Sequence, residues 1–136
     1  MNSPAHDIAL YLQSLSFGTL AASSGWAIAV AREPVAPDTT ITVYDTGGQG
    51  PDTDELDEFL PDIQVRVRAP DYIAAYAKSE GIRAALTLTQ PIYALTSDFT
   101  LIVMTQEIAS LGRDDNDRHI LVASYSCRRV DADDPT

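Results

Sequence analysis

Residues 61–86 read P-D-I-Q-V-R-V-R-A-P-D-Y-I-A-A-Y-A-K-S-E-G-I-R-A-A-L, and along them the hydrophobic period changes from two residues to about 3.6. The first part has the pattern of a strand with one buried and one wet face, because Ile63, Val65 and Val67 alternate with Gln64, Arg66 and Arg68. Pro70 ends this strand, since proline fixes its own φ and disfavours a helical residue before it. The second part predicts a helix whose apolar stripe lies on the sheet, formed by Tyr72, Ala75, Ser79, Ile82 and Leu86.

A glycine interrupts this predicted helix at position 81. Glycine is less favourable than alanine by roughly 1 kcal/mol inside a helix. Gly81 therefore predicts either a bend in the helix or a close contact against its backbone.

The rest of the chain supplies one more helix and four more strands. A helix is predicted over residues 4–15, after the N-cap candidate Ser3. Strands are predicted at residues 26–32, 39–45, 99–110 and 119–129, and the last two form a hairpin around the polar turn 111–118. The predicted class is α+β: a single mixed sheet of about five strands with two helices packed on one face, in the order α-β-β-β-α-β-β. Residues 1–130 are expected to form one domain, and residues 131–136 a disordered acidic tail.

Residues 45–60 are predicted to form a long mobile loop. The glycines at positions 47, 48 and 50, followed by Pro51, are expected to end the preceding strand. The carboxylates that follow repel one another, and the only apolar anchors are Leu56, Phe59 and Leu60. The loop is expected either to become ordered on contact with a partner or to be a tolerated surface insertion.

The charge of the chain argues against a DNA-binding module. Twenty acidic and nine basic residues give a formal net charge of −11, whose field repels free nucleic acid. The basic residues gather on predicted strands and on the predicted hairpin, at Arg66, Arg68, Arg113, Arg118, Arg128 and Arg129. These local positive patches are expected either to pair with acidic loops of neighbouring copies or to be simply solvated.

The sequence contains no motif that predicts a reaction. The acidic run 52–58 lacks the glycine of a calcium-binding loop, and no lysine and hydroxyl pair follows the glycines at 47–50 to hold a phosphate. The two histidines, His6 and His119, have no neighbour typical of a general base. The single cysteine, Cys127, excludes an internal disulfide and is expected to be a buried apolar residue. We therefore predict no enzyme activity, no catalytic residue, no cofactor and no metal, and the longest apolar run is too short to span a membrane.

Four segments, in this order, carry a family resemblance: V-Y-D-T-G-G at residues 43–48, P-D-I-Q-V-R-V-R followed by Y-I-A-A-Y within residues 61–76, L-G-R-D-D-N-D-R-H at residues 111–119, and C-R-R at residues 127–129. Together they resemble the tail terminator proteins of long-tailed bacteriophages, a group also described as minor capsid or tail completion proteins. The sequence departs from this family at two places. Asp117 stands where relatives commonly have glycine, and the acidic stretch 52–59 is longer than the usual connection.

The resemblance implies a structural virion protein that catalyses no reaction. Similar proteins cap the finished tail tube as a homohexameric ring, stop its polymerisation and face the head-completion or connector protein, and DNA passes through the ring without specific binding. The implied location is the virion tail at the head–tail interface, after assembly in the host cytoplasm, with no membrane partner. We predict that the interface with other copies or partners includes Arg66, Arg68, Arg113, Arg118, Leu56, Phe59 and Leu60. The alternatives are another virion component, such as a head-completion or tail tube protein, and a small soluble ligand-binding or enzymatic α+β domain.

Overall fold

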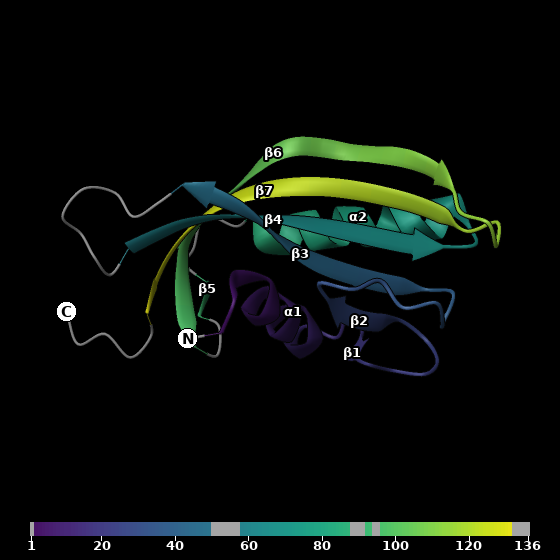
Figure 1. Ribbon diagram of the computed structural model, residues 1–136, viewed down its shortest axis with the longest axis horizontal. Coiled ribbons are helices and arrows are strands. Elements are labelled where there is room, and N and C mark those ends of the chain that lie inside the picture. The colour runs from purple at the N-terminus through teal and green to yellow at the C-terminus, as the bar shows by residue number, and fades with distance from the viewer. Residues whose placement is uncertain (1, 50–57, 88–91, 94–95, 132–136) are drawn as a thin grey trace.

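A computed structural model describes residues 2–49, 58–87, 92–93 and 96–131 (Figure 1). Two helices accompany a sheet of seven strands within these residues. In chain order the elements are α1 (Pro4–Ser14), β1 (Thr19–Leu20), β2 (Ala27–Val30), β3 (Thr40–Gln49), β4 (Glu58–Ala69), α2 (Tyr72–Leu86), β5 (Ile92–Tyr93), β6 (Ser97–Arg113) and β7 (His119–Asp131). None of the described helices is both long and apolar enough to cross a membrane.

The sheet is mixed, and its strand order is β1-β2-β3-β4-β7-β6-β5. The pairs β1–β2 and β2–β3 are parallel, and all the other pairs are antiparallel. The predicted α+β class is confirmed. The predicted count of about five strands is low, because β1 and β5 each contain only two residues and so have no sequence period.

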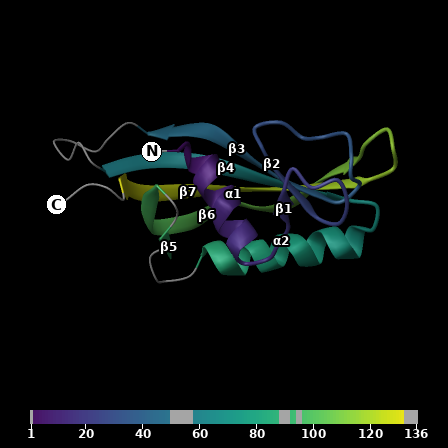
Figure 2. The same ribbon diagram turned by 90° about the horizontal axis from the view of Figure 1, so that it is seen from below.

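Both helices pack on one face of the sheet (Figure 2). α1 contacts mainly β2 and β3, whereas α2 contacts β4, β7 and β6. The core contains the alternating residues of β4, Ile63, Val65 and Val67, together with Leu12 of α1 and Ile82 of α2. We call this face the helix face and the opposite one the outer face.

The predicted stripe of α2 is correct except at its first residue. Ala75, Ser79, Ile82 and Leu86 are buried, but Tyr72 is 43% exposed. The Tyr72 ring lies edge-on to His119, with 5.5 Å between the ring centroids. The start of α2 therefore lies beside the first residue of β7 and is only partly covered.

Gly81 allows a close contact between α2 and the segment that follows α1. A Cβ atom at this position would lie 3.1 Å from the Phe17 ring. The contact is extended by Lys78, whose Nζ lies 4.6 Å from the centroid of the Trp26 ring and donates to the Phe17 carbonyl. The predicted role of Gly81 as a site of close approach agrees with this packing.

The N-terminal end of α1 is fixed by three acceptors from different parts of the chain. Ser3 Oγ accepts from the His6 N–H, as predicted for the N-cap, and Asp45 Oδ1 of β3 accepts from the Ala5 N–H at 2.9 Å. Asp7 is fully buried and accepts from the hydroxyls of Thr96 and Ser97 at the start of β6. These contacts join α1 to β3 and to the start of β6.

The prediction that residues 46–51 cannot continue a strand is wrong for residues 46–49. β3 continues to Gln49 and pairs with β4, with an irregularity in register between Asp45 and Gly47. Gly47 and Gly48 adopt φ angles of 100° and 109°, which glycine reaches without a Cβ clash. The described parts of β3 and β4 form a projecting arm (Figure 1). Residues 52–57, which contain most of the acidic run and the predicted anchor Leu56, lie outside the described residues.

β6 and β7 form the predicted hairpin, and both strands are longer than predicted. Asp117 in the turn adopts φ 62°, so an aspartate has the left-handed conformation that glycine takes most easily. β7 extends to Asp131, which the sequence predicts as the first residue of the acidic tail, whereas residues 132–136 lie outside the described part of the chain. β4 and β6 run parallel, but β7 lies between them.

Candidate assembly surfaces

Two of the predicted interface arginines are buried inside the protomer. Arg68 of β4 is 3% exposed and donates to Glu33 Oε1 at 3.2 Å and to the Pro37 carbonyl at 2.7 Å. Arg118, at the end of the β6–β7 turn, is 5% exposed and donates to the Val35 carbonyl at 2.6 Å. Both side chains therefore hold residues 33–37 against the outer face.

The other two predicted arginines are more accessible. Arg66 also lies on the outer face, and its Nε is 3.7 Å from Glu33 Oε2. Arg113 is exposed and pairs with Asp117 across the hairpin turn at 2.9 Å. Arg66 and Arg113 can therefore reach a partner without unfolding, whereas Arg68 and Arg118 are buried under residues 33–37. The interface role of all four arginines stays a prediction.

The electrostatics of the outer face follow from this burial. Burial lowers the pKa of Arg68 from its ordinary value, and the nearby charge of Arg118 lowers it further, while Glu33 opposes both effects. The Arg118 backbone N–H, which donates to Asp114 at 2.9 Å, is the main cause that holds the pKa of Asp114 below its usual value. The Arg118 Nε–H donates to the other carboxylate oxygen of Asp114 at 2.8 Å. Asp114 thus fixes both the turn and the arginine that holds residues 33–37.

Two of the three predicted apolar anchors lie on the projecting arm. Phe59 and Leu60 of β4 are half-buried. Leu60 lines a small depression of about 210 Å³, with Leu101 and Val103 of β6 among the other lining residues. Leu101 and Val103 are 50% and 46% exposed. The structure therefore places one predicted anchor in an accessible apolar patch.

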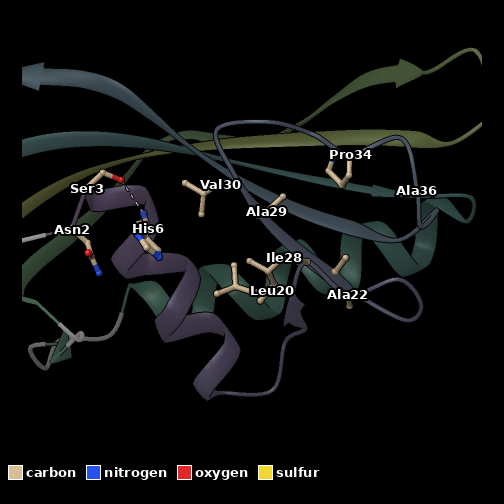
Figure 3. Close-up of a pocket in the computed structure, with 12 residues that line it drawn as sticks. Asn2, Ser3, His6, Leu20, Ala22, Ile28, Ala29, Val30, Pro34 and Ala36 are labelled. Atoms are coloured by element: carbon tan, nitrogen blue, oxygen red, sulfur yellow. Dashed lines mark hydrogen bonds between the residues drawn. The ribbon is translucent and has the colours of Figure 1, made fainter.

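A larger apolar groove of about 690 Å³ lies at the opposite edge of the sheet (Figure 3). Asn2, Ser3 and His6 at the start of α1 form one end, and Pro34 and Ala36 form the other. Between these ends lie small and apolar residues of β1, β2 and the segment that follows β1: Leu20, Ala21, Ala22, Ala27, Ile28, Ala29 and Val30. The groove thus follows the outer edge of β2.

His6 lines the groove, and Cys127 lines the depression beside Leu60. Across the described residues, no three histidine, cysteine or acidic side chains are grouped so that they could hold a metal ion. The Cys127 thiol is buried, and burial raises its pKa to about 12, so it is a poor nucleophile. His119 lies against Tyr72, and His6 is an exposed residue at the end of the groove. The apolar side chains that line the groove and the patch are suited to protein contact.

The chain was compared with known protein families, curated proteins and solved structures. Residues 11–131 match the family described as bacteriophage tail terminator protein. The chain belongs to the bacteriophage tail terminator family. A search of curated proteins found no match. Among solved structures, the fold resembles a chain from the virion of a native gene transfer agent particle, with 16% identity, a TM-score of 0.65, and coverage of 96% of this chain and 100% of that chain.

As a tail terminator family member, the protein is a structural component of the virion tail. Sequence reasoning missed the groove and the exposed pair Leu101 and Val103. The groove is formed by four short segments within residues 2–36, and none of them has a sequence motif of its own. The pair could have been found, because Leu101 and Val103 alternate with Ile102 and Met104, so that both faces of this strand are apolar.

Proposed function

We propose that the protein caps the finished tail tube as a homohexameric ring and joins the tail to the head-completion or connector protein. The observation that carries this proposal is the family match, which covers almost the whole domain. Capping requires a surface that binds the tube end and a surface that binds neighbouring copies. The arm, the depression lined by Leu60, Leu101 and Val103, and the groove along β2 can supply such surfaces.

The charge of the chain is compatible with DNA passage through the ring. Each copy carries a net charge of −11, so six copies carry −66. DNA phosphates are repelled by an acidic wall, which favours sliding over binding. We therefore propose that DNA passes through the ring without specific contact. No catalytic step is needed for this role, and we propose none.

A phage whose gene for this chain carries an early stop codon tests the proposal. Without the terminator, tube polymerisation should continue beyond the normal length, and filled heads should stay separate from tails. Plasmid-encoded protein should restore both properties. A complete absence of tubes would indicate a tube subunit, and tails of normal length that fail to join heads would indicate a head-completion protein. Either of these two results would overturn the capping role.

A further inference from the structure

The two opposite edges of the sheet each contain strand backbone without a partner strand. In the described part of the chain, β5 pairs with β6 only at Phe99 and Asp98, so the outer edge of β6 is unpaired from Leu101 onward. At the other edge, β1 pairs with β2 only as far as Ile28. Unpaired strand edges can add a strand from another chain.

The β2 edge presents Val30 to a partner. The N–H groups of Ala27 and Ala31 point toward β3 and donate to the carbonyls of Thr39, just before β3, and of Val43. Because successive residues of a strand alternate, the N–H and C=O of Val30 face the opposite way, toward the groove. The Ala21 N–H donates to the Ile28 carbonyl and ends the pairing with β1.

β6 offers a short regular segment with apolar side chains on both faces. Leu101–Met104 pairs continuously with Arg128, Cys127, Ser126 and Tyr125 of β7, and register shifts occur immediately before and after it. These irregularities restrict regular pairing to four residues, which is also the length of β2. On the outer face this segment carries the exposed side chains of Leu101 and Val103.

The charges at the two edges are complementary. Arg32 lies two residues beyond β2 and is exposed. Unlike the other lysine and arginine side chains, it forms no ion pair or hydrogen bond with any described residue. β6 carries two acids, Asp98 and Glu107, that form no ion pair within the described residues. In a chain with a net charge of −11, an unpaired arginine beside an apolar groove is a favourable contact for the acidic edge of another copy.

We infer that neighbouring copies join head to tail, with residues 101–104 of β6 from one copy along the β2 edge of the next. Leu101 and Val103 enter the apolar groove, and Arg32 meets an acid of the incoming strand. β6 runs antiparallel to β2 within one protomer. Neighbours in a ring of six are related by a rotation far short of a half turn, so the strands at the junction stay antiparallel.

This inference rests on the proposed ring and specifies its contact. A head-to-tail contact uses two different surfaces of each copy, and repetition of such a contact closes a ring when the rotation between copies allows it. A contact of one edge with the same edge of a second copy would produce only a dimer. The position of the groove and the strand at opposite edges of one sheet therefore favours the ring.

Cysteine cross-linking tests the contact, because Cys127 is the single native cysteine and is buried. Ala29→Cys is mixed with Leu101→Cys in one sample and with Val103→Cys in another, under conditions in which light scattering detects rings, or on isolated tails. All three positions lie on the outer face, and a disulfide requires Cα atoms within about 7 Å. The matched control is Ala84→Cys on the exposed surface of α2.

We expect a disulfide-linked dimer in at least one mixed sample and in none of the single variants or control mixtures. A chain with both cysteines of the reactive pair should give a ladder of up to six linked copies. Adding Arg32→Glu to the Ala29→Cys variant should reduce the yield roughly tenfold through like-charge repulsion. Intact rings that give no mixed cross-link would overturn this contact but leave the capping role in place. Failure to form any ring, in solution or on tails, would overturn both.

Discussion

At the scale of single residues, the buried arginines Arg68 and Arg118 stabilise the protomer by binding the segment 33–37. Arg68 donates to the carbonyls of Val35 and Pro37, and Arg118 donates to the Val35 carbonyl, so that both hold an irregular segment on the outer face. The alternation of residues 63–69 correctly predicts that Arg66 and Arg68 share the face opposite the core. It could not predict that residues 33–37 cover one arginine more than the other, because a segment without regular structure has no sequence period.

Arg68→Ala is expected to lower the free energy of unfolding by about 2–4 kcal/mol, because Glu33 and two backbone carbonyls lose a buried donor. The matched control is Arg66→Ala, whose looser contact with the same carboxylate should contribute less than about 1 kcal/mol. Urea denaturation of both variants measures the difference. Equal effects would show that the buried hydrogen bonds of Arg68 do not stabilise the fold.

Asp114 makes the stability depend on pH. Its pKa is lower in the folded protein than the ordinary value of 3.8, so its contribution is fully present above that value. The contribution is lost as the pH falls through the folded-state pKa. We expect the stability advantage of the native protein over Asp114→Asn to be constant near neutral pH and to shrink below pH 3.8. Urea denaturation of both proteins across this range provides the check, and an advantage that grows on acidification would contradict it.

At the scale of elements, the projecting arm depends on glycine at two neighbouring positions. A Cβ at Gly48 would lie 2.3 Å from the Leu60 carbonyl oxygen, whereas a Cβ at Gly47 would have no atom within 4 Å. Gly48→Ala should therefore destabilise by about 1–3 kcal/mol more than Gly47→Ala, since both share the backbone cost but only one adds a clash. Thermal unfolding of the two variants isolates the clash. Equal stabilities would mean that the two strands separate at no cost.

The acidic run 52–58 is expected to help the protein dock on the end of the tail tube. A deletion of residues 52–58 removes the carboxylates and Leu56 but leaves Phe59 and Leu60 in place. We expect the deletion variant to fold and to lose tube capping, because its acids can no longer meet basic groups on the tube end. Electron microscopy of tube length with purified protein measures capping. Full capping by the folded variant would show that the segment is a dispensable insertion.

The elements that the sequence predicts best are those in which apolar residues recur with the period of a helix or a strand. Both helices and the five longer strands were expected from periodicity and from caps such as Ser3. The arm was missed because glycines usually interrupt strands, whereas here Gly47 and Gly48 extend β3 in a conformation open to glycine. The groove was missed because its lining comes from α1, two short strands and a connecting segment, which only the tertiary structure brings together.

At the scale of the whole molecule, function came from family resemblance and geometry came from the structure. Charge and composition argue against a DNA-binding module, and the sequence contains no apolar run long enough for a membrane span, but these features do not distinguish a virion component from a small enzyme. The four segments quoted above resemble the terminator family, and the match over residues 11–131 confirms the family. The surfaces at the two sheet edges then suggest how identical copies meet in a ring.

Cryo-electron microscopy of purified tails, with this protein located by a bound Fab fragment, tests the capping role most directly. We expect one ring of six copies at the head-proximal end of every tail of normal length, and none along the tube. Within that ring, β6 of each copy should lie beside the groove along β2 of the next. Copies distributed along the tube, or an end structure that lacks this protein, would contradict the capping role.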